Sequence, residues 1–505
     1  MVEKINTRGS ERVWFVPFIA TIAVVIFFFG FARMFDGSFR GNDDTIYFYQ
    51  MAVEQFHPGE SAPLHKEILN YFAQQDNADF FLRRWNFRVN NATHYLVMNT
   101  AIYGASRVVR MFADGVKFDY ALIISLSVAF GVIVGAIIAA TILRWAIISS
   151  GDPILACGTA LGMAIVAALS LFASKGVLLR PFAASFTALG GNKPSTLESI
   201  IYIVKSFLVG GSEYSIFGYT PRGQVFLIGL AVFLLRWRGA WLAAYGVAAA
   251  LLLFHHSMGA LFLAWLIAID IIVRPRIFDL RIITICILAL GSALARGTIL
   301  ADLRLWPFIV AGSVLAALLV ALWLARRQEL RFRPLDSLEN RLLLPFRNRL
   351  DQLGPIGSDL TVGFSLCLMT IPLAILMNHV GDPYSAVFFW SDLIPRSFAM
   401  LQPAFFVGLT ILALRWVRTQ IACSPSWFYG ATLCLAVLLA APVALWAMAP
   451  SALGRATSEI YQVSPYLGQP LPKLSTQARE AAFHYAVAFQ LDTGQNVLQP
   501  MLRRQ

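Results

Sequence analysis

The sequence contains few charged residues. Only 13% of its 505 residues are Asp, Glu, Lys or Arg, whereas 58% are hydrophobic. A soluble globular domain carries about 25% charged residues, so this composition excludes an ordinary soluble protein. Apolar stretches long enough to span a bilayer recur along the whole chain, and lipid is therefore the expected solvent for much of it.

Cysteine is also scarce, and several common site motifs are missing. The five cysteines show no paired CxxC spacing of the kind that a metal or redox site uses. The chain lacks a Walker-type loop, a Rossmann glycine pattern and an HExxH sequence, so nucleotide hydrolysis and zinc proteolysis find no support. We interpret the cysteines as small core residues: Cys157, Cys286, Cys367, Cys423 and Cys434.

Acidic residues are outnumbered by basic ones, 28 to 40, which gives a formal net charge of +12. Such an excess can indicate a nucleic-acid partner. In a membrane protein, however, Lys and Arg gather in cytoplasmic connections. The basic run from Arg326 to Arg349 lies in one such connection, where anionic headgroups are its expected contact. We therefore expect membrane lipids as partners, and no nucleic acid.

The apolar runs predict an all-α polytopic membrane protein with about eleven transmembrane helices. The first run has no small-residue cleavage site after it and is expected to remain as a helix. The two short runs at 223–236 and 240–254 are compatible with tilted or partly re-entrant helices. The expected spans are 13–32, 120–143, 154–173, 223–236, 240–254, 257–273, 280–296, 306–325, 360–378, 398–415 and 428–449.

Alternating connections place the basic ones, including those at Arg236 and Arg274, on one side, which the positive-inside rule identifies as cytoplasm. The chain then divides into a cytoplasmic amino terminus, a first transmembrane helix, an outer loop, a helix bundle and an outer carboxyl-terminal segment. Their expected bounds are 1–12, 13–32, 33–119, 120–450 and 451–505. The Arg-rich composition indicates a bacterial inner membrane, with the carboxyl terminus in the periplasm.

The outer loop is too long to serve only as a connection, so we expect it to carry structure of its own. Its segments 45–55 and 65–74 have helical patterns. The carboxyl-terminal segment has a further amphipathic candidate at 476–490, after a Pro-rich stretch. We expect these helices to form a small cap on the outer face of the membrane.

The stretch from Gly41 to Ala52 places two adjacent carboxylates, Asp43 and Asp44, a few residues outside the first span and ahead of an aromatic-rich helix. It resembles the opening of the first outer loop in the GT-C superfamily of polyprenyl-phosphate-dependent glycosyltransferases. The layout of spans and outer segments is similar to that family as well. The resemblance implies a polyprenyl-phosphate-sugar donor, a glycan, lipid or protein acceptor, and Asp43 or Asp44 as the catalytic base or as a ligand that positions a metal.

A carboxylate at a membrane surface is able to deprotonate an acceptor hydroxyl, or to hold a divalent cation beside a leaving phosphate. We expect Asp43 to matter most and Asp44 next. The alternative is that Asp43 and Asp44 only cap the helix that follows them. Whether a metal ion is required stays open, and the same two residues are its candidate ligands.

Two adjacent histidines, His255 and His256, lie at an expected outer junction between apolar runs. Ionisable groups are costly there unless they face a cavity or a partner. Imidazole is able to bind a metal or a phosphate, or to transfer a proton. The alternative is a polar hairpin tip that only turns the chain, and the sequence does not distinguish one histidine from the other.

A further outer connection gathers His379, Asp382 and Arg396 near the membrane surface. Arg222 lies at the outer end of another span. Guanidinium groups bind phosphate in a bidentate manner, and a helix N-terminus adds amide donors. We therefore expect these residues to bind substrate or its phosphate. The alternative is interfacial anchoring by arginine and aromatic side chains.

The leading hypothesis is an inverting transfer of a sugar at the outer face of the membrane. A transporter or flippase is the second hypothesis, and it requires ionisable residues at mid-membrane depth. Asp270, the main acid within an apolar run, lies near a cytoplasmic helix end. A polymerase or ligase of the O-antigen type is the third, but its large outer loop is expected late in the chain, whereas here it comes first.

Overall fold

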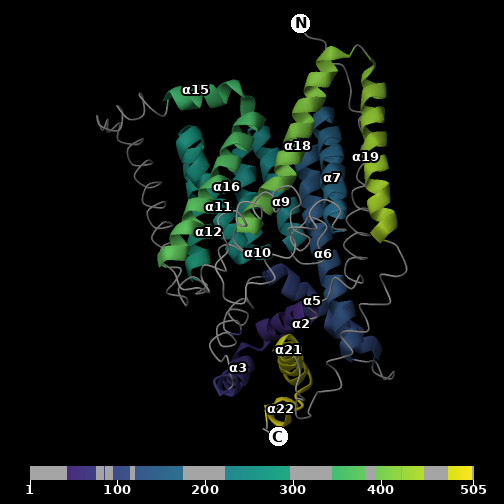
Figure 1. Ribbon diagram of the computed structural model, residues 1–505, viewed down its shortest axis with the longest axis vertical. Coiled ribbons are helices and arrows are strands. Elements are labelled where there is room, and N and C mark those ends of the chain that lie inside the picture. The colour runs from purple at the N-terminus through teal and green to yellow at the C-terminus, as the bar shows by residue number, and fades with distance from the viewer. Residues whose placement is uncertain are drawn as a thin grey trace. The chain divides into compact units, whose positions relative to one another are not determined.

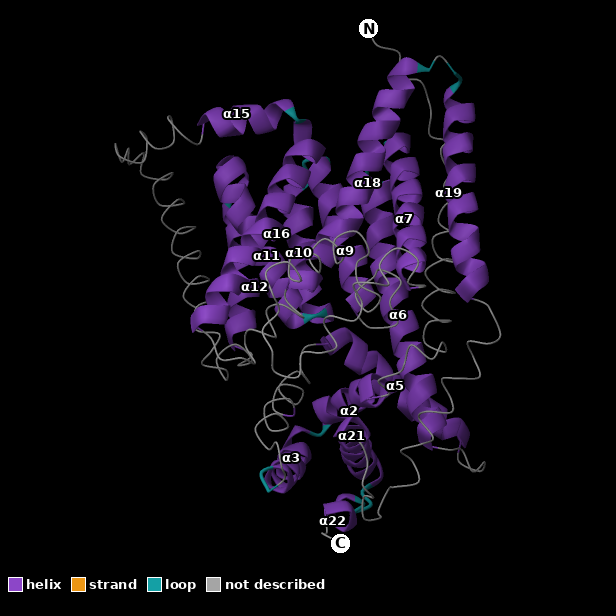
Figure 2. Cartoon of the chain, in the orientation of Figure 1, coloured by secondary structure: helices purple, strands orange, loops and turns teal. Residues whose placement is uncertain are grey.

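The computed structural model describes residues 43–74, 85, 95–113, 120–174, 222–295, 344–380, 394–421, 423–447 and 476–502. All regular secondary structure within these ranges is helical (Figure 2). The all-α class expected from the sequence is therefore confirmed. The helices are α2 (Asp43–Phe56), α3 (Pro58–Phe72), α5 (Leu96–Ala113), α6 (Tyr120–Ile148), α7 (Pro153–Ser174), α9 (Arg222–Trp237), α10 (Trp241–Phe254), α11 (His256–Val273), η3 (Pro275–Ile277), α12 (Leu280–Ala295), α15 (Leu344–Gln352), α16 (Gly354–Val380), α18 (Ile394–Gln420), α19 (Pro425–Ala447), α21 (Thr476–Thr493) and α22 (Leu498–Leu502).

The described helices belong to two compact units. Unit 1 takes its described residues from 139–252 and 256–443, and it contains α7, α9, α11, α12, α15, α16, α18 and most of α10 and α19. Unit 2 takes its described residues from 26–138, 253–255 and 444–505, and it contains α2, α3, α5, α21 and α22. The continuous helix α6 contributes to both units, with the change at residue 138.

Each expected span within the described ranges coincides, to within a few residues, with one of the helices α6, α7, α9, α10, α11, α12, α16, α18 and α19. The expected spans 13–32 and 306–325 lie outside the described residues. Within the described ranges, 2 helices are long and apolar enough to cross a membrane, Leu126–Ile148 of α6 and Met400–Gln420 of α18. The helix positions are confirmed, and the number of crossings stays a prediction.

In unit 1, α18 packs along α7 and also contacts α9 and α16 (Figure 1). Two glycines of α7, four residues apart, allow this approach. A Cβ atom on Gly162 would lie 2.6 Å from the Cα atom of Val407, and one on Gly158 would lie 2.4 Å from Cγ1 of Ile411. Small residues at this spacing let helix backbones come close, as they do between helices in membranes. The contact of α7 with α18 therefore depends on the absence of side chains at these positions.

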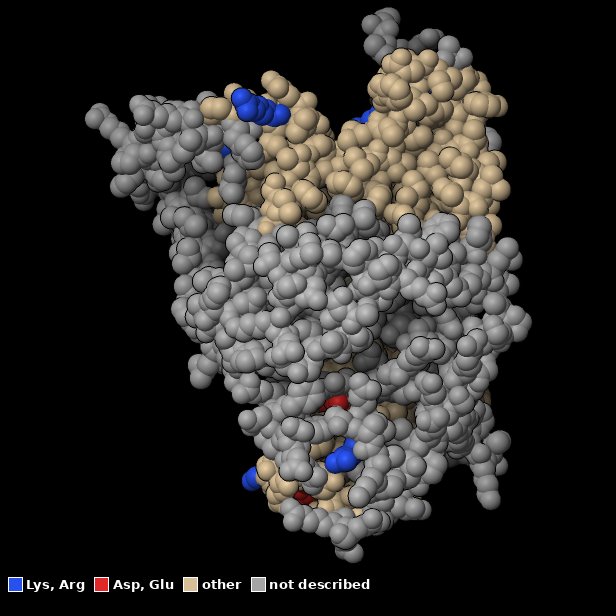
Figure 3. All heavy atoms as spheres, viewed as in Figure 1, with Lys and Arg blue, Asp and Glu red and all other residues tan. Residues whose placement is uncertain are grey.

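Several turns meet at one end of unit 1. Arg238 follows α9 and donates a hydrogen bond of 2.6 Å to Oγ of Ser149, in the turn after α6. Arg415, near the end of α18, lies 3.1 Å from Oδ2 of Asp152. These contacts agree with the sequence-based grouping of basic connections on one side, while the compartment stays a prediction. On the face shown in Figure 3, Lys and Arg atoms of this unit lie near α15, and the sides of its described helices are largely uncharged.

Helix α2 is the central element of unit 2, where it packs against α21, α5 and α3 (Figure 1). Its buried residues occupy consecutive positions and do not form a single stripe. The side chains of Ile46, Tyr49, Met51, Ala52 and Val53 are at most 1% exposed. A helix that is apolar and buried all round lies inside a core. Helix α2 is therefore held by neighbours on several sides.

The helices expected at 45–55 and 476–490 are confirmed as α2 and α21. The helix expected at 65–74 is confirmed as α3, but it begins earlier, at Pro58. Proline suits the first position of a helix, because its missing amide hydrogen would be unpaired there in any case.

Helix α5, which the sequence analysis did not predict, completes the unit. Its buried side chains Met98, Ile102 and Ala105 follow the i, i+4, i+7 spacing of one helical face. Ile102 also meets α6, because a Cβ atom on Gly131 would lie 2.4 Å from its Cγ1 atom. The hydrophobic periodicity of 98–105 was the available signal for this helix.

Candidate functional site

The acidic pair singled out by the sequence occupies the start of α2, which begins at Asp43. The backbone of residues 43–45 is helical, while the side chains of Asp43 and Asp44 lie outside the described residues. Acidic residues are favoured in the first helical turn by the free amide groups and the helix dipole. The helix start is thus compatible with both capping and catalysis, and both interpretations stay predictions.

One turn after the acidic pair come two aromatic residues with different partners. The ring of Tyr47 lies 5.3 Å from that of His484 in α21. The ring of Phe48 meets that of Tyr95 edge-on, with 5.5 Å between centroids. Residues i and i+4 share a face of a helix. The second position of the acidic pair therefore lies on the face of α2 directed toward Tyr95.

Tyr95 in turn contacts His255. Its hydroxyl oxygen lies 3.2 Å from Nε2 of the imidazole, and the ring centroids are 4.7 Å apart. Both side chains are buried, with exposed fractions of 5% for Tyr95 and 1% for His255. Unit 2 includes both residues. A candidate histidine is thus joined to α2 through Tyr95 and Phe48.

The neighbouring His256 has other surroundings. It begins α11, and its Nε2 atom lies 3.1 Å from the carbonyl oxygen of Ala293 in α12. A carbonyl only accepts, so Nε2 is the donor in this hydrogen bond. The structure therefore gives His255 and His256 different partners, whereas the sequence does not distinguish the two. A hairpin tip that only turns the chain is expected to be exposed, and the burial of both His255 and His256 argues against that alternative.

Asp492, in the last turn of α21, is a buried centre that the sequence analysis missed. Its Oδ2 atom accepts hydrogen bonds from the hydroxyls of Tyr49 at 2.7 Å and Tyr120 at 3.0 Å. Arg107 lies 3.1 Å from its Oδ1 atom, and Arg110 also contacts Oδ2. The carboxylate itself is fully buried. Asp492 thus ties α2, α5 and α6 to α21.

These surroundings fix the protonation of neighbouring groups. Burial raises the pKa of the Tyr49 phenol, and the charge and hydrogen bond of Asp492 raise it further. Burial alone lowers the pKa of Arg107, but its hydrogen bond with Tyr103 and the charge of Asp492 outweigh burial, and the pKa is raised. A neutral phenol donates to the carboxylate, whereas a phenolate would be repelled by it. Tyr49 therefore stays neutral and Arg107 stays charged.

A second buried network lies on the other side of α2. His65 Nε2 lies 2.7 Å from Glu54 Oε1, and the Trp85 indole donates a hydrogen bond of 3.2 Å to His65 Nδ1. The Gln50 amide donates to Glu54 at 2.5 Å, and its oxygen contacts His484 Nδ1. The Trp85 ring stacks on that of His484, with 4.3 Å between centroids and 13° between planes. The contacts close into a ring that holds α2 in place.

Unit 1 contains a separate buried cluster of charges around Arg236, at the end of α9. Its Nε atom donates to Asp359 at 3.0 Å, and its guanidinium donates to Asp270 at 2.9 Å. Arg274 donates to Asp359 at 2.5 Å and lies 3.7 Å from Asp270. Two guanidinium groups therefore balance two carboxylates. Buried charges are tolerated when they are paired in this way.

This cluster changes the interpretation of the basic connection that follows α9. The sequence places Arg236 and Arg274 among the basic residues of a membrane surface, but the Arg236 side chain is 0% exposed. It therefore binds α11 and α16 and does not meet lipid headgroups. Trp241, the first residue of α10, covers both guanidinium groups, with centroid distances of 5.3 Å and 5.1 Å. Asp359 lies far away in sequence and was not predicted.

The remaining candidate residues are placed only by their backbone. Arg222 is the first residue of α9, Arg396 lies in the first turn of α18, and His379 lies in the last turn of α16. Their side chains lie outside the described residues, as does all of Asp382. Their proposed contacts with substrate stay predictions.

The acidic pair is also the candidate metal site of the sequence. Among the residues that the structure describes, no group of three or more His, Cys, Asp or Glu side chains is arranged to hold a metal ion. The side chains of Asp43 and Asp44 are not among the described ones. Their role as metal ligands stays a prediction.

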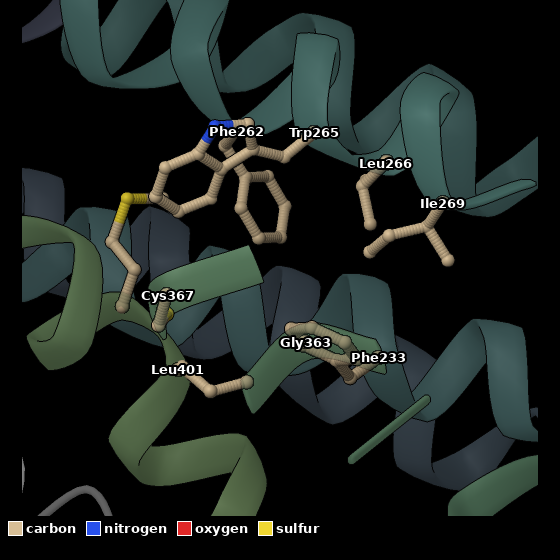
Figure 4. Close-up of a pocket in the computed structure, with 9 residues that line it drawn as sticks. Phe233, Phe262, Trp265, Leu266, Ile269, Gly363, Cys367 and Leu401 are labelled. Carbon is tan, nitrogen blue, oxygen red and sulfur yellow. The ribbon is translucent and has the colours of Figure 1, made fainter. Parts of the chain in front are cut away.

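An apolar cavity lies between helices of unit 1 (Figure 4). Phe262, Trp265 and Ile269 project from α11 toward Cys367 of α16 and Leu401 of α18. The lining is almost wholly apolar, so it offers little that would orient a sugar.

The structure thus links α2, at whose start the acidic pair lies, to the candidate His255 through Phe48 and Tyr95, all in unit 2. Asp492 and the Glu54–His65 pair support α2 from other sides. Among protein-family models, curated proteins and solved structures, none matches this chain.

Proposed function

We propose that this chain is an integral membrane glycosyltransferase with a GT-C-like layout of about eleven transmembrane helices. It transfers a sugar from a polyprenyl-phosphate donor to a glycan, lipid or protein acceptor at the outer face of a bacterial inner membrane. The amino terminus is cytoplasmic and the carboxyl-terminal segment is periplasmic. The proposal rests on the sequence of the first outer loop and on the surroundings of α2.

The membrane part of the proposal has support from α6 and from the helices of unit 1. Two described stretches, Leu126–Ile148 and Met400–Gln420, have the length and composition of membrane-crossing helices. The close approach of α7 and α18 at Gly158 and Gly162 is of the kind that holds helices together in lipid. Shorter apolar helices, such as Gln224–Trp237 of α9, pack against α18.

The observation that carries the catalytic part is the path from α2 to His255. Phe48 lies one turn after Asp44, it meets Tyr95, and Tyr95 holds the imidazole of His255. Base, acceptor and leaving group must converge for transfer to occur. The register of α2 favours position 44 as the one nearer to His255, whereas the sequence alone favours Asp43.

In the proposed reaction a carboxylate of the acidic pair removes the proton from an acceptor hydroxyl. The oxygen attacks the anomeric carbon of the donor as the bond from that carbon to the phosphate oxygen breaks, which inverts the anomeric configuration. The proton stays on the carboxylate, and the phosphate leaves with its polyprenyl chain. Arg222 and Arg396 are proposed to stabilise that phosphate, because guanidinium binds it in a bidentate manner. A divalent ion held by the acidic pair would supply further charge neutralisation.

A transporter is less well supported. It would need ionisable groups that can take up or release charge within the membrane. The buried cluster around Arg236 pairs two arginines with Asp270 and Asp359, and it lies at helix ends. These contacts suit a clamp between helices, and they leave no net charge in the cluster to move.

The test is turnover of radiolabelled polyprenyl-phosphate sugars by purified protein, with glycan, lipid and peptide acceptors in parallel. Asn preserves the size of Asp and still caps a helix. Asp44→Asn and Asp43→Asn are therefore expected to lower the rate by about 10²–10⁴-fold, the usual range for loss of a general base, without unfolding the protein. The larger loss is expected for Asp44→Asn.

Glu60→Gln serves as the matched control, because it neutralises an exposed carboxylate on the neighbouring α3. Its rate is expected to stay close to that of the wild type. Near-normal turnover in both single variants and in the double variant would leave the acidic pair with a capping role only. No transfer by the wild type with any donor or acceptor would argue against the enzyme itself.

A further inference from the structure

One face of α5 carries large apolar side chains that unit 2 does not cover. Val108, Met111 and Phe112 are 53%, 77% and 82% exposed. Their i, i+3, i+4 spacing places them on one side of the helix. An exposed apolar patch of this kind marks a surface that binds a partner or a membrane.

The buried part of α5 lies nearer its amino-terminal end. Met98, Ile102 and Ala105 fill the interior of unit 2, each with at most 6% of its side chain exposed. Val108 and Phe112 come three and seven residues after Ala105 and continue its face, while Met111 lies beside them. The apolar face of α5 therefore passes from buried to exposed in the carboxyl-terminal half of the helix.

Positive charge flanks this outward face. Arg107 and Arg110 directly precede Val108 and Met111 in the chain, and their side chains are 39% and 24% exposed. Both bind the single buried carboxylate of Asp492, so one positive charge in this group remains in excess. An apolar helical face bordered by arginines is complementary to a bilayer surface with anionic headgroups.

The chain itself brings this surface near a bilayer. Helix α5 ends at Ala113 and α6 begins at Tyr120, a separation that a fully extended chain spans in about 25 Å at most. The stretch Leu126–Ile148 of α6 is long and apolar enough to cross a membrane. Leu126 and Phe130 on α6 are themselves exposed, at 37% and 54%.

We propose that Val108, Met111 and Phe112 insert into the lipid surface beside α6, with Arg107 and Arg110 at the level of the headgroups. This segment of the loop would then lie on the bilayer and not in the surrounding water. The inference rests on the proposed crossing of the membrane by α6, but not on the proposed chemistry. Insertion of these side chains anchors α5. Because Arg107 and Arg110 bind Asp492, it also fixes the distance of α2 from the membrane surface.

The test places a photoreactive benzoylphenylalanine at one position of the full-length protein in lipid nanodiscs, followed by mass spectrometry of the adducts. Position 112 probes the proposed surface, and position 130 on α6 probes the proposed crossing. Position 60 on α3 is the control, because the Glu60 side chain is 70% exposed and lies in a polar segment. We expect lipid adducts at 112 and 130 to exceed those at 60 by at least about tenfold.

The outcomes separate the two proposals. Lipid adducts at 130 but not at 112 would overturn the docking of α5 and leave the crossing by α6 intact. No lipid adducts at 130 would overturn the crossing itself. Adducts from 112 to a second copy of the chain would show that the face is a dimer interface. Replacing part of the phosphatidylcholine by phosphatidylglycerol is expected to raise labelling at 112, and equal labelling would overturn the role assigned to the two arginines.

Discussion

The hydroxyl of Tyr49 donates a hydrogen bond of 2.7 Å to the carboxylate of Asp492, although 443 residues separate the two in sequence. The contact joins the helix that begins with the acidic pair to the helix near the carboxyl terminus. Arg107, Arg110 and Tyr120 bind the same carboxylate. Unit 2 therefore depends on a buried charge from the carboxyl-terminal segment.

Asp492→Asn is expected to destabilise unit 2. The amide keeps the size of the side chain but leaves two arginines without their counter-charge. Loss of one partner of a buried ion pair costs about 3–5 kcal/mol, and the lower end is expected because both arginines reach solvent. The measurement is the rate of tryptic cleavage within the first loop. Glu60→Gln, an exposed substitution in the same unit, is the control, and equal cleavage in both variants would contradict the expectation.

Unit 2 is expected to lose stability at alkaline pH. The pKa of Tyr49 is raised in the folded state, so folding favours the neutral phenol. This stabilisation is fully present below the unfolded pKa of about 10 and is lost as the pH rises toward the folded value. Thermal unfolding between pH 8 and 11 is the measurement. Tyr49→Phe should flatten the decline, while Tyr71→Phe, which removes another hydroxyl of unit 2, should not. Parallel declines in all three proteins would contradict this.

We expect the stability of the charge cluster in unit 1 to depend on the balance of positive and negative charges, and less on how many charges it contains. Asp359→Ala leaves Arg236 and Arg274 with one carboxylate and should cost about 3–5 kcal/mol. The double substitution Arg236→Met with Asp270→Leu removes one charge of each sign, leaves Arg274 paired with Asp359, and should cost less. The measurement is the thermal midpoint of detergent-solubilised protein. A double variant at least as unstable as the single one would refute the balance argument.

A side chain at Gly162 is expected to force α7 and α18 apart. Its Cβ atom would lie 2.6 Å from the Cα atom of Val407, and a backbone atom is not displaced easily. Gly162→Ala should therefore cost about 1–3 kcal/mol, the range for overpacking. Gly246→Ala is the control, because a Cβ atom there has nothing within 4 Å and alanine favours the helix. Equal thermal midpoints for the two variants would argue against the close contact.

The positions of the helices could be predicted from the sequence because their signal is local. Apolar runs such as 120–143 and 398–415 identify α6 and α18 without knowledge of their neighbours. Helix α5 was missed because its buried residues alternate with polar ones over a short stretch. A single i, i+4 pair, Met98 and Ile102, does not identify a helix by itself. Its meaning follows from the packing of α5 against α2 and α6.

The site was less predictable, since its contacts join distant segments. The charge of Arg236 indicates a basic connection, whereas its pairing with Asp359 across 123 residues depends on how α9 meets α16. Asp492 has no motif around it. The acidic pair was found from its local pattern, but the path from α2 to His255 through Tyr95 follows from packing alone.

The contact between Tyr49 of α2 and Asp492 of α21 also determines when the folding of unit 2 is completed. Tyr49 is synthesised 443 residues before Asp492, and a ribosome adds about 5–20 residues per second. The first loop must therefore wait about 20–90 seconds on the nascent chain for its last partner. During that interval the interior of unit 2 is open, so assembly factors or proteases have access to a segment that the finished protein buries.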